Sequence, residues 1–306
     1  MFIISLYATI SSNESQFFFQ KSQIVLFLIN SMSLKTWQAD FYKTPFQNRE
    51  HQFQWQLLIC DDQGKIIYQA ICEQKEANLS WLSSKLESAI EQEIPDIIQV
   101  FRPQSVNLLI AAADKFGIKI EATRRTPKLK EILKKQGTNN SFNPVKLEQP
   151  PPQTLPRNLW GERWQFVTFP GGGLIEFFSD CPIPIADIPN LLLPISLEPA
   201  STVRIPGIII YGGRTSMYLA RWLVDVKPVA LNYIPTQVDK SGGLVLESDL
   251  VDRWILATFE DSDMAKAAQQ YELRKNDSQG LHFLVVQPDD SAMTYSGFWL
   301  LRHEEI

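Results

Sequence analysis

Residues 95–122 and 206–233 follow one pattern: a short apolar run, a loop, an amphipathic helix and a second apolar run. The two stretches align without gaps, and Pro95, Ile97 and Asp114 meet identical residues in the second stretch. Short apolar runs are typical of strands that are buried on both faces of a sheet. A strand–helix–strand unit of this length predicts a right-handed parallel crossover in each half of the chain.

Local signals mark where the helices begin and end. Ser105 and Ser216 (or Thr215) belong to the residue types that cap helix N-termini, and Gly117 and Pro228 to those that follow a helix. A further helix is predicted after Asn78, which is also a capping residue type. The apolar stripe of that helix consists of Leu79, Leu82, Leu86 and Ile90.

A second pair of similar segments, 55–68 and 164–177, precedes the crossovers. Each has apolar runs on both sides of a glycine-containing turn, which predicts an antiparallel hairpin. Residues 37–42 add a possible strand to the first half. Antiparallel strands followed by alternating helices and strands predict an α/β (α+β) fold class. We therefore expect two related mixed-sheet domains, RNase H-like, from an internal duplication.

Proline content sets the expected domain boundaries. The stretch from Cys181 through Pro206 contains six prolines, which exclude a long helix there, and three consecutive prolines at 150–152 indicate a semi-rigid linker. The second half also carries a predicted strand at 254–259, a helix at 263–274 and a terminal hairpin at 280–301. The expected organisation is a disordered or non-native extension (1–31), an N-terminal domain (35–140), the linker (141–157) and a C-terminal domain (158–306).

Composition narrows the classes of function. The net charge is −5, so nucleic-acid binding would need a local basic surface rather than a basic average. The three cysteines are odd in number and unpatterned, as in reduced cytosolic proteins, and they form no metal-site spacing with the histidines. The apolar runs of the first 31 residues are too short to span a bilayer. We expect no cofactor, no metal and no stable membrane insertion.

No catalytic constellation is evident. A nuclease of RNase H-like fold needs clustered carboxylates to hold two divalent ions, with one acid in the first strand. The expected first strand, 53–60, has no acid, and Asp61 and Asp62 lie in a turn, where aspartate is common. The 212–216 loop opens a helix after a strand but lacks the lysine of a phosphate-binding P-loop. The sequence therefore predicts a protein that is not an enzyme.

A basic segment follows the first crossover. Arg124, Arg125 and Lys128 lie in a run that also contains Lys119, Lys130, Lys134 and Lys135, opposed by only two glutamates. Arg102 follows the neighbouring strand. Because the carboxyl ends of parallel strands share one edge of a sheet, we expect the three arginines to converge there. They would bind phosphates or stack on bases, although such runs are also common on solvated helix faces.

Several motifs resemble one family, the Tab-two/Atab-two-like proteins, over residues 37–302. In the first half these motifs are 37–42 (WQADFY), 55–60 (WQLLIC), 101–104 (FRPQ) and 124–126 (RRT). In the second half they are 155–164 (LPRNLWGERW), 205–207 (IPG), 280–284 (GLHFL) and 297–301 (GFWLL).

The resemblance implies an RNA-binding translation activator of cyanobacteria or chloroplasts. Its partner would be the single-stranded leader of a photosystem I subunit message, with a possible role for photosystem II and contacts to translation or photosystem assembly proteins. It also implies that Trp299, Leu300 and Leu301 contribute to RNA binding, and it favours a cyanobacterial cytoplasm. A protein–protein assembly scaffold and a degenerate nuclease remain alternatives.

Overall fold

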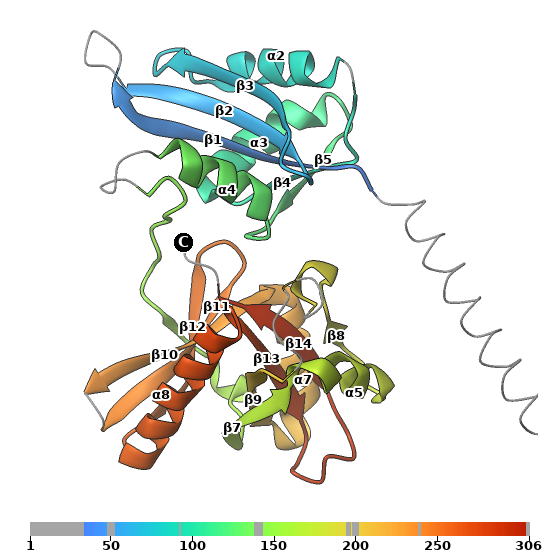
Figure 1. Cartoon of the computed structure of the whole chain (residues 1–306), viewed down its shortest axis with the longest axis vertical. Helices are drawn as coiled ribbons and strands as arrows, with labels where there is room; N and C mark the ends of the chain where they lie inside the picture. Colours follow the sequence, from blue (N-terminus) through green and yellow to red (C-terminus); the bar gives the residue numbers. More distant parts are fainter. Residues whose placement is uncertain are drawn as a thin grey trace, which may run out of the picture. The chain divides into compact units, whose positions relative to one another are not determined.

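The computed structural model describes residues 34–47, 53–91, 93–137, 143–193, 197, 202–237 and 240–303. The predicted extension, 1–31, lies outside these residues. The described part is mixed α/β with three mixed sheets (Figure 1). It forms two compact units, one of residues up to Val100 with Ser105–Glu121, the other of Phe101–Gln104 with Ala122–Ile306. None of its helices is long and apolar enough to cross a bilayer.

The first unit is built on a five-stranded sheet of order β3-β2-β1-β4-β5. The strands are β1 (Thr36–Gln47), β2 (Phe53–Asp61), β3 (Ile66–Glu73), β4 (Ile97–Val100) and β5 (Lys119–Ala122). β2 is antiparallel to β1 and β3, which confirms the predicted hairpin, and β4 is parallel to β1. The additional strand predicted at 37–42 is β1, at the centre of the sheet.

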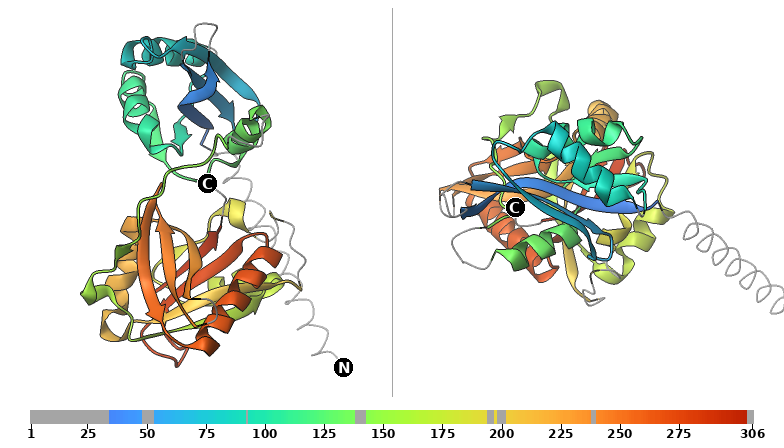
Figure 2. Two further views of the ribbon diagram at one scale, coloured as in Figure 1. Left: turned by 90° about the vertical axis from the view of Figure 1, so that its left-hand side faces the viewer. Right: turned by 90° about the horizontal axis from the view of Figure 1, so that it is seen from above.

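Two helices cover one face of this sheet, α2 (Leu79–Ile90) and α3 (Pro103–Asp114) (Figure 2). Asn78 caps α2 as predicted, since its Oδ1 accepts a hydrogen bond from the Trp81 N–H at 3.1 Å. The predicted start of α3 at Ser105 is wrong. The helix begins at Pro103, because proline fits the first helical turn, and Ser105 is buried within it.

The second unit contains two sheets. The larger has the order β7-β9-β13-β14-β8 and the smaller the order β10-β11-β12-β6. The larger comprises β7 (Arg163–Pro170), β8 (Ala186–Asp187), β9 (Arg204–Tyr211), β13 (Leu281–Gln287) and β14 (Gly297–Arg302). The smaller comprises β6 (Gln153–Thr154), β10 (Pro228–Gln237), β11 (Ser241–Ser248) and β12 (Asp252–Phe259). One apolar cluster holds side chains from both sheets, so the sheets pack face to face.

This topology corrects the prediction of a second crossover within one sheet. β9 and β10 are joined by α7 (Ser216–Val226), as the pattern requires, but they lie in different sheets. β9 already pairs with β7 on one side and β13 on the other, so no edge is left for β10. The strand order of the first unit is therefore not repeated in the second.

The second predicted hairpin is also wrong. β7 is followed by a glycine-rich turn, η2 (Gly171–Gly173), and then by a helix, α5 (Leu174–Asp180). Leu174 and Phe178 are buried four residues apart, and this helical spacing places both side chains in one apolar cluster. A strand would have turned alternate residues of this segment to opposite faces.

The C-terminal elements agree with the sequence pattern. The predicted strand at 254–259 lies in β12, and the predicted helix at 263–274 lies in α8 (Ser262–Asp277), capped by Asp261. β13 and β14 form the expected antiparallel hairpin. Their side chains alternate between two apolar clusters, one on each face of the sheet. This hairpin is therefore a central part of the core.

Candidate nucleic-acid interface

The Trp299-Leu300-Leu301 segment is buried on both faces of the larger sheet. Trp299 is 1% exposed, and Leu300 and Leu301 are 0% exposed. Trp299 and Leu301 enter the cluster between the two sheets, while Leu300 enters the cluster beneath α5. The contribution to RNA binding that the resemblance implies leaves open whether these side chains contact RNA or act through the fold, and their burial favours the second. Their contribution to RNA binding would be indirect, through the folding of the hairpin.

Two glycines make room for aromatic rings in this core. A Cβ at Gly297 would collide with the Trp299 ring, and a Cβ at Gly207 would collide with the Phe283 ring of the neighbouring strand. Both glycines belong to motifs of the resemblance, 297–301 and 205–207. The motif residues therefore specify how the sheet packs, since protein interiors leave little free volume for an added methyl group.

Side chains satisfy the open edge of β10. The Leu231 N–H donates to His282 Nε2 at 2.8 Å, and Lys275 Nζ donates to the Leu231 carbonyl at 2.9 Å. The Tyr233 N–H donates to Glu272 Oε1 at 2.7 Å. Unpaired backbone groups at a buried edge are costly, so these bonds stabilise a strand that has a neighbour on one side only.

His282 is held neutral at this edge. Because its Nε2 accepts from Leu231, its Nδ1 carries the proton and donates to the Gly280 carbonyl at 2.8 Å. Burial lowers the pKa of His282 well below its usual value, and the nearby Lys275 lowers it further. Burial also lowers the pKa of Lys275, against the opposing effect of Glu272. These groups serve the fold.

Arg124 is the anchor of a buried polar network rather than a surface ligand. It is 2% exposed, its Nη1 contacts Glu247 Oε2 at 2.6 Å and its Nε donates to the Leu250 carbonyl at 2.6 Å. Glu247 Oε1 accepts from Asn232 Nδ2 at 2.9 Å, and Asn232 Oδ1 accepts from Lys275 Nζ at 2.8 Å. Arg124 is therefore not available at the surface for the predicted RNA contact, because its charge is buried and held by these partners.

The other predicted basic residues keep some exposure. Arg125 is partly exposed and pairs with Asp187 at 3.0 Å, a type of contact that contributes little in solvent. Arg102 is partly exposed and donates to the Pro144 carbonyl at 2.7 Å. Lys128, in the first turn of α4 (Pro127–Gln136), is also partly exposed. The predicted convergence of three arginines on one free rim does not occur.

The carboxylate that sequence reasoning missed is Asp40. The central strand of the first sheet is β1, not β2, and Asp40 is buried on its face opposite the apolar core. An acid that alternates with apolar residues within a predicted strand could have been recognised from the sequence. Among the described residues, however, no group of three or more His, Cys, Asp or Glu side chains could hold a metal ion.

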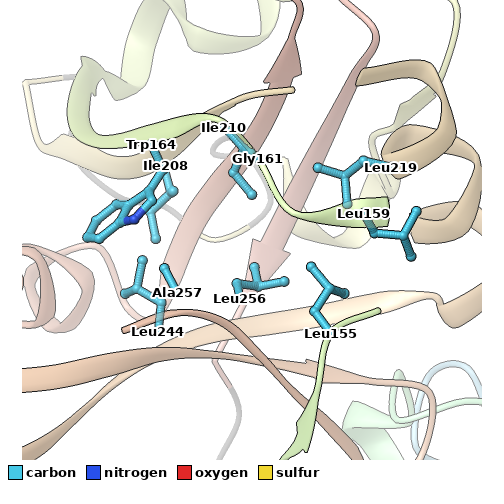
Figure 3. A pocket seen from close by; sticks show the side chains of 10 residues that line it. All are labelled: Leu155, Leu159, Gly161, Trp164, Ile208, Ile210, Leu219, Leu244, Leu256 and Ala257. Carbon is cyan, nitrogen blue, oxygen red and sulfur yellow. The ribbon is translucent and has the colours of Figure 1, made fainter. Parts of the chain in front are cut away.

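A small cavity lies between the two sheets of the second unit (Figure 3). Figure 3 shows the lining side chains turned toward one another, including Leu159, Trp164, Leu219 and Leu244. Its volume of about 20 Å³ and its mainly apolar lining leave no room for a ligand larger than a water molecule. This cavity is a packing defect of the core.

Comparison with known proteins identifies the family. A family model described as "RNA-binding protein Tab2/Atab2, C-terminal domain" matches residues 142–302, and one described as "RNA-binding protein Tab2/Atab2 N terminal" matches residues 36–136. The chain belongs to the Tab2/Atab2 RNA-binding family. The sequence motifs had indicated the same family on both halves.

Two curated plant proteins are similar over most of their length. "Protein TAB2 homolog, chloroplastic" of Arabidopsis thaliana is 26% identical over 285 residues, which cover 88% of this chain and 75% of the relative. The protein of the same name from Zea mays is 25% identical over 289 residues, which cover 89% and 73%. No solved structure matches the chain.

Proposed function

We propose that this chain is a non-catalytic RNA-binding protein that supports synthesis of photosystem I subunits, and of photosystem II subunits as a further role. The observation that carries the proposal is the match of RNA-binding family models to both halves of the chain. The proposed partner is the single-stranded leader of a photosystem subunit message, with translation or assembly proteins as further partners. The proposed location is a cyanobacterial cytoplasm.

The exposed part of the basic segment supports this proposal. Lys134 and Lys135 are exposed on α4, Lys128 and Arg125 are partly exposed, and only Glu131 opposes them on the helix. Lys135 and Glu131 pair across one helical turn, which leaves Lys128 and Lys134 as the freer cations. Flexible lysines on a helix face contact phosphates without reading sequence.

Titration of the full chain into a single-stranded leader RNA at several salt concentrations tests the proposal. Phosphate contacts predict an affinity that falls with salt, with a slope of about 0.7 per phosphate for single strands. Lys128→Ala with Lys134→Ala is expected to flatten that slope by about 1.4. Binding that is absent, or that does not respond to salt, would remove the RNA-binding proposal.

The first sheet supports an RNase H-like assignment for that half. Its three antiparallel strands are followed by β4 and β5 with α3 between them, in the order β3-β2-β1-β4-β5. We propose this fold for the N-terminal domain, with expected limits of 35–140, a linker at 141–157 and a C-terminal domain at 158–306. The different strand order of the second unit weakens an internal duplication as the origin of both halves.

One observation favours the alternative of an assembly scaffold. An open groove of about 610 Å³ lies on the smaller sheet. Its apolar lining residues are Pro152, Ile234, Val245, Ile255 and Phe259, and the others are two glycines, Thr236, Ser241, Thr258 and Glu260. Glu260 is its one charged lining residue, so the groove suits an apolar segment better than a phosphate. Ile255→Asp would abolish capture of a photosystem polypeptide and leave RNA affinity unchanged if this groove is the scaffold site.

A further inference from the structure

The second unit presents a cluster of exposed arginines and aromatic rings far from the predicted basic segment in sequence. We call it the η1–α7 surface; it consists of Arg157, Trp160, Arg214, Tyr218 and Arg221. Trp160 is 55% exposed and Tyr218 is 63% exposed, and no other aromatic side chain that the structure describes is more than half exposed. The three arginines are exposed and have no hydrogen bond or ion pair with another described residue.

Core packing brings the two segments of this surface together. The short helix η1 (Arg157–Leu159) packs against α7. Leu159 and Leu219 turn into the same apolar cavity from these two elements (Figure 3). Their sequence neighbours, Trp160 and Tyr218, remain outside in solvent. Two exposed rings therefore flank a pair of buried leucines on one side of the second unit.

A second tie fixes the segment after Trp160. The Glu162 carboxylate occupies the space that a Cβ would take at Gly213, whose backbone has a φ of +53°. The positive φ favours glycine at that position. Trp160 is thus held from both sides of the chain. Before it, η1 packs on α7, and after it, Glu162 lies against η4 (Gly213–Thr215), beside the first turn of α7. The Trp160 Nε1 also donates to the Leu155 carbonyl at 2.8 Å, which fixes the ring.

The remaining members lie at and before the start of α7. Tyr218 and Arg221 are one turn apart on the helix, Arg214 lies in η4 just before it, and all three are exposed. Asp225 lies one turn beyond Arg221 and the Glu162 carboxylate lies against Gly213, so this surface has three arginines and two carboxylates. The neighbouring Arg163 is already paired with Asp290 at 2.7 Å. The local charge is positive although the chain as a whole is acidic.

We propose that the η1–α7 surface is the site at which this protein stacks unpaired bases of single-stranded RNA. This rests on the proposed RNA-binding function and assigns it a second site. Guanidinium groups contact phosphates and also stack on bases, and exposed tryptophan and tyrosine rings are the usual stacking platforms. A duplex hides its base faces, so rings exposed in this way match a single strand.

The test compares matched variants of the full chain. The binding variant combines Arg214→Ala, Tyr218→Ala and Arg221→Ala. The control combines Lys115→Ala, Lys266→Ala and Leu273→Ala, which likewise removes two exposed cations and one large exposed side chain. A fluorescein-labelled oligouridylate of about 15 nucleotides is the probe. The binding variant is expected to raise Kd at least tenfold and to reduce the salt slope by about 1.4, whereas the control matches the wild type.

A spectroscopic readout separates stacking from general electrostatics. Tryptophan emission that is quenched by the oligouridylate in the wild type is expected to lose that quenching in Trp160→Phe, with a small change in Kd. Arg221→Lys is expected to keep the salt slope, and Arg221→Ala alone reduces it by about 0.7. If the combined variant does not fold, these single substitutions at exposed positions are measured in its place.

The outcomes distinguish the two proposals. If the wild type binds neither the oligouridylate nor the leader RNA even at low salt, both the RNA-binding function and this site are wrong. If it binds the leader RNA alone, the η1–α7 surface is not a general site for unpaired bases, although the RNA-binding function stands. If the wild type binds and the combined variant matches it in Kd and slope, the η1–α7 surface is not the RNA site, although the RNA-binding function stands. In that case the exposed rings would belong to a protein interface.

Discussion

Arg124 illustrates how a basic residue that resembles a nucleic-acid contact takes a structural role. Its guanidinium lies against Glu247 at 2.6 Å with both side chains buried, and Asn232 and Lys275 extend the network. Breaking such a pair leaves one charge without compensation in a poorly solvated interior. The geometry therefore predicts a stability effect where the sequence pattern predicted a binding effect.

Arg124→Met is expected to destabilise the protein by about 3–5 kcal/mol, because Glu247 is left buried and unpaired. The double variant Arg124→Met with Glu247→Gln is expected to recover a large part of that loss, since the neutral amide still bonds to Asn232. Urea denaturation measures both. The folded Arg124→Met protein is expected to bind RNA as tightly as the wild type. If the fully folded variant binds RNA more weakly, Arg124 is an RNA ligand after all.

His282 predicts a pH dependence of stability. Its folded-state pKa lies well below its usual value, so the unfolded chain binds a proton first as the pH falls. The free energy of unfolding is then undiminished above about pH 6.5 and decreases below it, by up to about 1.4 kcal/mol per pH unit. His282→Gln is expected to flatten this decrease in urea titrations between pH 7 and 5, and an unchanged pH dependence in that variant would contradict the assignment.

Among the elements, the β13–β14 hairpin is buried along almost its whole length. Each face of β14 meets a different apolar cluster, so the strand has no solvent-facing side along 297–301. Substitutions here act through folding of the larger sheet. Any loss of RNA binding that follows is expected to track the unfolded fraction.

Trp299→Ala is expected to cost about 3–5 kcal/mol through the cavity it leaves, and Trp299→Phe less. Gly297→Ala keeps the tryptophan residue, but the added methyl group forces the Trp299 ring to move, so this variant is also expected to destabilise the protein. Thermal unfolding and RNA titration at a temperature where each variant is folded would check this. Loss of RNA affinity by a fully folded Trp299→Phe protein would contradict an indirect role.

The whole chain combines an acidic average with local basic surfaces. A net charge of −5 disfavours a polyanion at long range, so the proposed RNA binding would depend on α4 and the η1–α7 surface at short range. Asp40 is the carboxylate within the central strand of the first sheet, yet no metal-holding group of three acids, histidines or cysteines occurs among the described residues.

A labelled single-stranded RNA is therefore expected to remain intact when it is incubated with the protein and Mg²⁺. Two-metal hydrolysis needs carboxylates that hold two ions about 4 Å apart, which the described residues do not provide. Gel electrophoresis over several hours is the measurement. Cleavage that is abolished in Asp40→Asn would contradict the non-catalytic assignment and favour the nuclease alternative.

Local pattern was sufficient for two of the hairpins and two of the helices. The hairpin of β2 and β3, the Asn78-capped helix, α8 and the terminal hairpin all follow from periodicity and capping. It failed at 174–177, where a strand-like apolar run forms a helix. Short apolar runs are ambiguous because both a buried strand and a buried helix satisfy them.

Motif residues were sufficient to indicate the family, because several ordered motifs span both halves of the chain. Which arginine is free and which tryptophan is exposed depends instead on partners distant in sequence. Glu247 lies 123 residues from Arg124 and removes it from solvent. Trp160 and Trp299 are the same residue type, and the packing of neighbouring strands and helices leaves one exposed and the other buried.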